Sequence, residues 1–251
     1  MPEILTAQEN TIFTITLNRP EKRNALNDAL INDLKVALRE ADKNETLRAV
    51  VIRGAGKDFC SGADLSALQK ISESDVLENW DDAHNLMELF AFIRKIKIPV
   101  IAAVQGRALA GGCGLATACD IVLASKTARF GYPEVKIGFV PAIVTAILRR
   151  NISEKRAFEL ITQGFEFSSE DAREIGLINR VFADETFEED MKNYVSVYEK
   201  VSRSAVVLSK KLLYQMDAMT FEAALESGVD VNTIARMTED CQRGIAKFLN
   251  K

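Results

Sequence analysis

Two stretches of the sequence decide the fold: "FCSGADLSAL" at residues 59–68 and "GRALAGGCGLATACD" at residues 106–120. In each, small residues and glycine separate a strand-like apolar run from a helix-like one. The first N–H groups of a helix have no partner within the helix, and the helix dipole adds positive potential around them. If the two turns are adjacent in space, they aim two donors at one point, and this is the arrangement of an oxyanion hole. One such turn alone favours close packing as its explanation, and the ordered pair is more specific.

The residues around these turns alternate between strand and helix patterns. The segment "TIFTITL" predicts a half-buried strand, whereas "RAVVIRG" and "VIAAV" predict strands buried on both faces. Leucines spaced by three and four residues predict a helix over residues 26–41, and a stripe formed by Val76, Trp80, Ala83, Met87 and Phe90 predicts a second helix. Two more strands are expected at residues 120–124 and 128–134. The pattern is that of an α/β protein.

After Pro141 the strand signals almost stop, and helix signals take over. Gly164 and Gly176 stand where helices end. The expected helix N-caps are Ser153, Ser168 with Asp171 in its first turn, Thr186 in a capping box with Glu189, Thr220 and Thr238. The change of pattern predicts two parts, residues 1–190 and residues 191–251.

Composition narrows the functional class. The chain has 251 residues, of which 47% are hydrophobic and 27% charged, as in a globular protein with a sizeable core. A net charge of -4 without a basic stripe argues against nucleic-acid binding. The N-terminus lacks the pattern of a secretory signal, and the apolar runs are too short to cross a membrane. Four cysteines without a C-x-x-C pair and one histidine, His84, predict a cytoplasmic protein with reduced thiols and no metal site.

Several motifs together resemble the crotonase superfamily, the enoyl-CoA hydratase/isomerase family. They are "NRPEKRNAL", "FCSGADL", "PVIAAVQGRALAGGCGLATACD", "FGYPEVKIGFVP" and "SSEDAREIGLINRVF", and their order and spacing follow the family over nearly the whole chain. The resemblance implies a spiral of β-β-α turns in residues 1–190, followed by a helical trimerisation region in residues 191–251. It also implies a homotrimer or a dimer of trimers (a hexamer).

The resemblance gives the two turns a role. Ala63 in "SGADL" and Gly111 in "LAGGCG" match the positions whose N–H groups hold the thioester oxygen of an acyl-CoA substrate, and an enolate of this thioester would be the stabilised anion. Coenzyme A enters as part of the substrate, so no permanently bound cofactor is expected.

One catalytic carboxylate of the family is present and one is missing. Glu134 in "YPEVKIG" matches the glutamate that acts as general acid/base, whereas Gly114 occupies the place of the other hydratase glutamate. The favoured interpretation is hydration of a 2-enoyl-CoA by a lyase, as in fatty acid metabolism. A double-bond isomerase that uses Glu134 alone is a close alternative, because one carboxylate suits a 1,3-proton transfer. A CoA-binding protein without turnover is the alternative from another class.

The resemblance also carries weaker assignments for coenzyme A binding. The predicted substrate-binding residues are Lys22, Arg23, Ala25, Asp64, Leu65, Ser66, and, reaching a neighbouring subunit's ligand, Phe248 and Lys251. Asp64 and Asp120 are also interpreted as structural acids. Trp80 and Met87 either form a wall of the acyl pocket or belong to the core. The residues that would set acyl specificity lie in 66–90 and 137–146.

Overall fold

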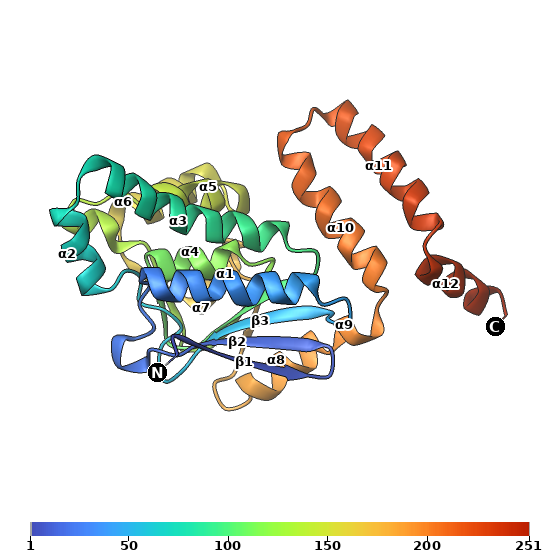
Figure 1. Cartoon of the computed structure of the whole chain (residues 1–251), viewed down its shortest axis with the longest axis horizontal. Helices are drawn as coiled ribbons and strands as arrows, with labels where there is room; N and C mark the ends of the chain where they lie inside the picture. Colours follow the sequence, from blue (N-terminus) through green and yellow to red (C-terminus); the bar gives the residue numbers. More distant parts are fainter. Residues whose placement is uncertain (1, 251) are drawn as a thin grey trace.

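A six-stranded sheet forms the centre of the molecule (Figure 1). This computed structural model describes residues 2–250, with the backbone but not the side chains of Leu65, Ser66 and Leu68. The strand order is β1-β2-β3-β4-β6-β9, with β1 antiparallel to β2 and the other neighbours parallel. The strands are β1 (Ile4–Glu9), β2 (Ile12–Leu17), β3 (Ala49–Gly54), β4 (Val100–Val104), β6 (Ile121–Ser125) and β9 (Arg180–Phe182).

Alternating side chains of the central strands build two separate cores. On β3, Val50 and Ile52 enter the larger core, whereas Ala49 and Val51 face the opposite side of the sheet. Helices α1 (Asp28–Lys43), α3 (Val76–Lys95) and α4 (Gly111–Ala118) cover the larger core, and α8 (Phe187–Val195) covers the smaller one (Figure 1). Burial on both faces explains the nearly continuous apolar runs of β3 and β4.

A small second sheet, ordered β5-β7-β8, carries the second of the two glycine-rich turns. Strands β5 (Arg107–Leu109) and β7 (Arg129–Gly131) are parallel, and β8 (Glu166–Ser168) is antiparallel to β7. Helix α4 follows β5 at once and is buried from Gly112 to Ala118. Its small residues let it pass through the centre of the molecule.

The remaining elements surround these sheets or extend from them. They are α2 (Leu65–Glu73), α5 (Ala142–Asn151), α6 (Glu154–Gln163), α7 (Ser169–Glu174), α9 (Val197–Lys200), α10 (Arg203–Gln215), α11 (Phe221–Arg236) and α12 (Glu239–Leu249), with the short 3-10 helices η1 (Pro20–Lys22), η2 (Pro133–Ile137) and η3 (Met216–Ala218).

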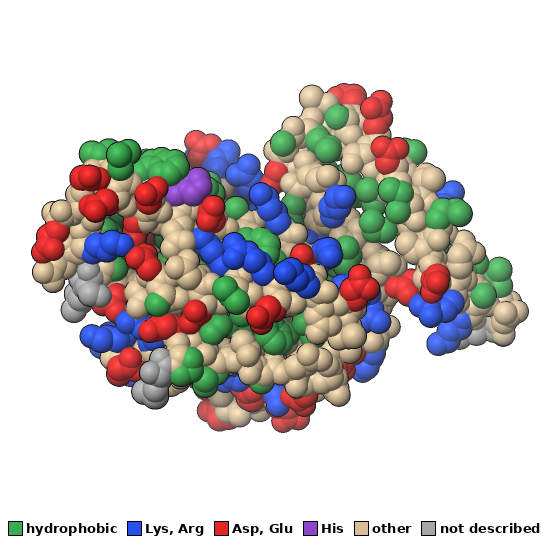
Figure 2. Space-filling view, in the orientation of Figure 1, with side chains coloured by type: hydrophobic (Ala, Val, Ile, Leu, Met, Phe, Trp, Pro, Cys, Tyr) green, Lys and Arg blue, Asp and Glu red, His purple; other side chains and the backbone are tan. Residues whose placement is uncertain are grey.

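Helices α10, α11 and α12 extend away from the sheets (Figure 1). Lys210 is the single buried residue within these three helices, and large apolar side chains such as Phe221, Val229 and Phe248 are exposed (Figure 2). Lys210 anchors α10 by donating hydrogen bonds to Asp120 (2.6 Å) and to the backbone oxygens at the end of α3 and before β4.

The structure corrects several predicted elements. Strands β1, β5, β8 and β9 had no counterpart in the predicted pattern, because β1 is mostly exposed and the other three have only three residues each. The strand predicted at residues 128–134 ends at Gly131, and Pro133 begins η2 instead. The apolar stripe predicted on the second helix is correct only at its end. Phe90 is buried as predicted, but Val76, Trp80 and Met87 are exposed, and the other buried residues of α3 are Leu89 and Ile93.

Most of the predicted helix ends are confirmed. The side chains of Ser168, Thr220 and Thr238 accept the expected capping hydrogen bonds, and Gly164 ends α6 in a left-handed conformation. Ser153 precedes α6 without a side-chain capping bond. The predicted capping box of Thr186 and Glu189 is wrong, because the Thr186 hydroxyl bonds to the carboxylate of Asp190 at 2.6 Å.

Candidate active site

The two glycine-rich turns touch each other. Cys60 and Ala108 form a parallel β-bridge, in which Cys60 N–H donates to the Arg107 oxygen and Leu109 N–H to the Cys60 oxygen, both at 3.0 Å. Gly62 lies against Ala110, and a Cβ on this glycine would lie 2.8 Å from the Ala110 Cβ. Gly62 also has a φ of +95°, which an L side chain rarely adopts. Glycine is therefore required where the turns meet.

Each of the two turns contributes one residue, Ala63 or Gly111, to the same pocket. Leu26 pairs with Ala63 by accepting from Asp64 N–H (3.1 Å) and donating to the Gly62 oxygen (2.7 Å). In such a parallel bridge, the N–H of the middle residue, Ala63, points to the opposite side. Gly111 is the first residue of α4, so its N–H has no acceptor within the helix. Ala63 and Gly111 both line one pocket.

The backbone just before Gly111 is strained. Ala110, the N-cap of α4, has φ of 49° and ψ of −127°, outside the left-handed helical region that non-glycine residues occasionally adopt. Its N–H donates to the Gly131 oxygen at 2.9 Å, which ties the turn to β7. Such strain costs of order 1–3 kcal/mol and persists only where the surroundings enforce it, typically at functional sites.

Glu134 lies on the same pocket, in the first turn of η2. Its Oε2 atom is buried and has no hydrogen-bond partner among the described residues. Burial raises the pKa of its carboxyl group above the usual value, because loss of water disfavours the charged form. Gly164 packs closely against η2, the helix that carries Glu134. A Cβ on Gly164 would lie 3.0 Å from a Val135 methyl group.

The pocket that joins these groups has a volume of about 1080 Å³. One wall comes from the start of α1 and from α2 and α3, and the other from η2 and the beginning of α5. Residues of both segments that were expected to set acyl specificity line it. Apolar lining residues include Leu26, Ala67, Ile71, Ala83, Leu86, Ile137, Phe139 and Ile143.

Gly114 lies one helical turn from Gly111, in a place with no room for a side chain. A Cβ on Gly114 would lie 2.3 Å from Val144 Cγ1 and 3.1 Å from two ring atoms of Phe90. Both neighbours are buried, at 4% and 2% exposure. Apolar side chains from α5 and α3 thus close the position where the resemblance would place a second glutamate.

A polar cluster of three side chains interrupts the apolar wall of the pocket. Lys70 Nζ donates to Asp28 Oδ2 at 2.7 Å, and the Asp82 carboxyl group lies near enough to Asp28 for the Asp28 charge to raise the pKa of Asp82. The cluster was not predicted from the sequence. Its members come from α1, α2 and α3, so no local spacing reveals it.

The residues predicted to bind coenzyme A are more scattered. Lys22 and Arg23 are exposed in and after η1, and Ala25 is buried. The described lining of the pocket includes none of the three. Asp64 is 4% exposed and pairs with Arg19 at 2.7 Å, a geometry suited to a structural brace.

The other residues predicted to bind coenzyme A lie outside the pocket, or their side chains are not among those that the structure describes. Backbone positions 65 and 66 begin α2, but their side chains are not described. Phe248 is 79% exposed on α12, and Lys251 lies outside the described residues. Trp80 stacks on His84 with ring centroids 4.6 Å apart. Trp80 and Met87 belong to neither the core nor the described pocket lining.

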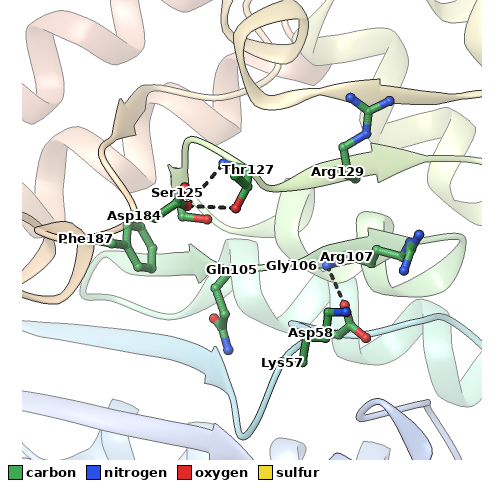
Figure 3. Close-up of a pocket in the computed structure, with 10 residues that line it drawn as sticks. All are labelled: Lys57, Asp58, Gln105, Gly106, Arg107, Ser125, Thr127, Arg129, Asp184 and Phe187. Atoms are coloured by element: carbon green, nitrogen blue, oxygen red, sulfur yellow. Dashed lines mark hydrogen bonds between the residues drawn. The ribbon is translucent and has the colours of Figure 1, made fainter.

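A second cavity of about 460 Å³ lies on another part of the surface (Figure 3). Its polar groups are largely paired with each other: Asp184 accepts from the Thr127 hydroxyl at 2.8 Å, and Asp58 accepts from Arg107 N–H at 2.9 Å. None of the predicted site residues lines it.

Within residues 2–250, no group of three or more His, Cys, Asp or Glu is placed to hold a metal ion. In the same range, no helix is both long and apolar enough to span a membrane.

Comparisons with known proteins agree with this geometry. Residues 7–251 match the family described as enoyl-CoA hydratase/isomerase. A putative enoyl-CoA hydratase of Thermus thermophilus is 36% identical over 99% of this chain and 98% of its own. The 2,3-dehydroadipyl-CoA hydratase of Escherichia coli is 33% identical over 100% of this chain and 97% of its own. The crystal structure of an enoyl-CoA hydratase from Mycobacterium smegmatis superposes with a TM-score of 0.96 at 31% identity, covering 100% of this chain and 97% of that one.

Proposed function

Because the chain belongs to the enoyl-CoA hydratase/isomerase family and has the crotonase fold, we propose that it hydrates a 2-enoyl-CoA, with Glu134 as general acid/base. The observation that supports the proposal is the buried, unpartnered Glu134 oxygen in a pocket that Ala63 and Gly111 also line. A buried polar atom without a partner is costly, so it marks a place where a ligand completes the hydrogen bonding.

The proposed reaction adds water across the double bond in two proton movements. The N–H groups of Ala63 and Gly111 donate to the thioester oxygen. Glu134 takes a proton from water as the water oxygen bonds to C3, and the π electrons move to the thioester oxygen as an enolate. Glu134 then returns the proton to C2. The donors are worth most in the enolate, because their fixed dipoles meet full negative charge there.

The raised pKa of Glu134 suits both movements. A carboxyl group whose pKa lies nearer neutrality is a stronger base than an ordinary glutamate and still gives the proton back. In this proposal no second carboxyl group takes part, so the Glu134 carboxyl group both accepts the proton from water and donates it to C2.

Double-bond isomerisation is the second candidate, and a specific observation favours it. The closed position at Gly114 leaves the catalytic end of the pocket without a second carboxylate from α4 to hold the water. In this alternative, Glu134 removes a proton from C2 of a 3-enoyl-CoA, which leaves a dienolate, and returns the proton to C4 to give the 2-enoyl-CoA; in the reverse direction it removes a proton from C4 and returns it to C2. A CoA-binding role without turnover is less well supported, because both turns and Glu134 are retained.

The proposal extends to coenzyme A and to assembly. Coenzyme A arrives with the substrate, and Lys22 and Arg23 are exposed cations that suit its phosphates. The apolar side chains exposed along α10–α12 suit contacts between copies of the chain, as a homotrimer or a dimer of trimers. Phe248 of one copy would then approach a neighbour's ligand. A cytoplasmic location fits the four free cysteines.

Mass spectrometry in heavy-oxygen water tests the reaction. The purified protein is given a panel of 2-enoyl-CoA and 3-enoyl-CoA substrates. Uptake of heavy oxygen into a 3-hydroxyacyl product is expected for hydration. Migration of the double bond without oxygen uptake would replace hydration by isomerisation, and binding of coenzyme A esters without either product would contradict both.

A further inference from the structure

The cluster of Asp28, Lys70 and Asp82 lines the same pocket as Ala63 and Gly111. A Cβ on Gly111 would lie 3.1 Å from a Leu26 methyl group and 4.0 Å from a Leu86 methyl group. Asp28 follows Leu26 by two residues. Asp82 precedes Leu86 by one turn of α3, about 6 Å along the helix axis. An acyl group whose thioester oxygen meets Gly111 would pass Leu86 and reach the cluster with its tail.

The two carboxyl groups of the cluster differ in their surroundings. Asp28 stands at the start of α1, where the helix dipole favours a negative charge, and it is also paired with Lys70. Asp82 is half-buried and lies near the Asp28 carboxylate, so burial first and this negative neighbour second raise the pKa of Asp82. With both carboxyl groups ionised the cluster carries one negative charge, and a proton on Asp82 makes it neutral.

The rest of the pocket offers few other polar side chains near this wall. Ala67, Ile71 and Ala83 flank the cluster on α2 and α3. The other ionisable groups lining the pocket, Glu134 and Lys136, belong to η2 on the opposite wall. The cluster is thus a polar patch within an apolar wall.

Three kinds of acyl tail can be compared at this patch. A hydrocarbon tail would displace water from the carboxyl groups and offer them no hydrogen bond, which is unfavourable. A carboxylate tail would meet a patch that is neutral or negative. A hydroxyl group can both donate to Asp28 or Asp82 and accept from Lys70 without adding charge.

We propose that Asp28, Lys70 and Asp82 form a specificity site that selects acyl-CoA substrates whose acyl tail carries a hydroxyl group. The inference rests on the proposed function, since it places an acyl-CoA in this pocket. Asp82 contributes as the half-buried member of the cluster, and Lys70 holds Asp28 in place.

The test compares binding of three unreactive ligands of equal chain length by isothermal titration calorimetry: hexanoyl-CoA, ω-hydroxyhexanoyl-CoA and adipyl-CoA. These saturated thioesters have no double bond to hydrate, so the result does not depend on turnover. ω-Hydroxyhexanoyl-CoA is expected to bind about three- to tenfold more tightly than hexanoyl-CoA, the effect of one or two net hydrogen bonds. Adipyl-CoA is expected to bind most weakly.

Two variants separate the cluster from general effects on α3. Asp82→Leu is expected to abolish the preference for the hydroxyl tail and to tighten binding of hexanoyl-CoA, a gain that a misfolded protein cannot show. Asp81→Leu changes the adjacent exposed carboxylate, which does not line the pocket, and is expected to leave all three affinities unchanged.

The outcomes distinguish this inference from the proposed function. Equal binding of the three ligands, or a hydroxyl preference that survives in Asp82→Leu, would overturn the specificity site alone. Tightest binding of adipyl-CoA would overturn it in favour of carboxylate recognition by lysine. Absence of binding of any of the three would contradict the acyl-CoA site itself and the specificity site with it.

Discussion

Glu134 and Gly114 are the two positions at which the family resemblance would place carboxylates, and the protein treats them in opposite ways. At Glu134, a carboxyl oxygen is buried without a partner, and the surrounding space is open to a ligand. At Gly114, Val144 and Phe90 fill the space in which any side chain would begin. The first position is held ready for hydrogen bonding, and the second is closed by apolar packing.

The difference shows that the loss of the second carboxylate is built into the packing. A simple exchange of glutamate for glycine would leave a cavity, and such cavities are destabilising in proportion to their volume. Here Val144 reaches to within 2.3 Å of the missing Cβ position. Of the two positions, only Glu134 therefore presents a carboxyl group to the pocket.

Replacing that carboxyl group is expected to have the largest effect. Glu134→Gln keeps the size of the side chain but removes the acid/base function, and kcat is expected to fall by about 10²–10⁴-fold. Binding of a saturated acyl-CoA should change little, since the backbone donors remain. Steady-state kinetics together with calorimetry measure the two effects. Turnover that persists at the wild-type rate would remove Glu134 from the mechanism.

Adding one carbon at the closed position is expected to destabilise the fold. Gly114→Ala places a methyl group against Val144 and Phe90 and should lower the free energy of unfolding by about 1–3 kcal/mol. Urea denaturation measures the change. Gly244→Ala is a matched control, because Gly244 lies in α12 with no atom within 4 Å of its Cβ position. The control is expected to be neutral or slightly stabilising. An equally neutral Gly114→Ala would show that the position is open after all.

Shortening the neighbour should recover part of that loss. In the double variant Gly114→Ala/Val144→Ala, the new methyl group occupies space vacated by the valine. If the two substitutions acted independently, their changes in unfolding free energy would add. The double variant should be about 1 kcal/mol more stable than this additive value, within the range found for residues in contact. A double-mutant cycle by urea denaturation measures this coupling. Strict additivity would mean that Val144 does not close the position.

How far the sequence could predict this site depends on where each signal lies. Ala63, Gly111 and Glu134 were placed by motifs of a few consecutive residues, and the structure brings all three to one pocket. The absence of a glutamate at Gly114 was also visible. The sequence did not show that Val144 and Phe90 fill the space beside Gly114. These two residues lie 30 positions after and 24 positions before Gly114 in the chain, and only folding brings them together.

The fold shows the same limit. Strands buried on both faces, such as β3 and β4, were predicted from their apolar runs. The three-residue strands β8 and β9 are defined by their pairing with β7 and β6, and three residues carry too little periodicity to reveal a strand. On α3, Phe90 of the predicted stripe is buried, but Trp80 and Met87 are exposed, and α3 buries Leu89 and Ile93 in addition to Phe90. Apolar periodicity therefore predicts that a segment is helical, but the elements packed against the helix determine which of its faces is buried.

The pH dependence of the reaction should show the smallest but most specific sign of a single carboxyl group. Burial raises the pKa of Glu134 above 4.5, and hydration needs its ionised form as base. The rate constant kcat/KM should therefore fall as the pH drops through a value above 4.5, by about tenfold per pH unit below it. Two carboxyl groups in contact would titrate in two coupled steps, because the first charge opposes the second. With Gly114 closed, Glu134 should give a single one-proton limb in a pH–rate profile. A two-proton limb would reveal a second acid near Glu134. If that two-proton limb persisted in Asp82→Asn, Asp82 would be excluded as the second acid.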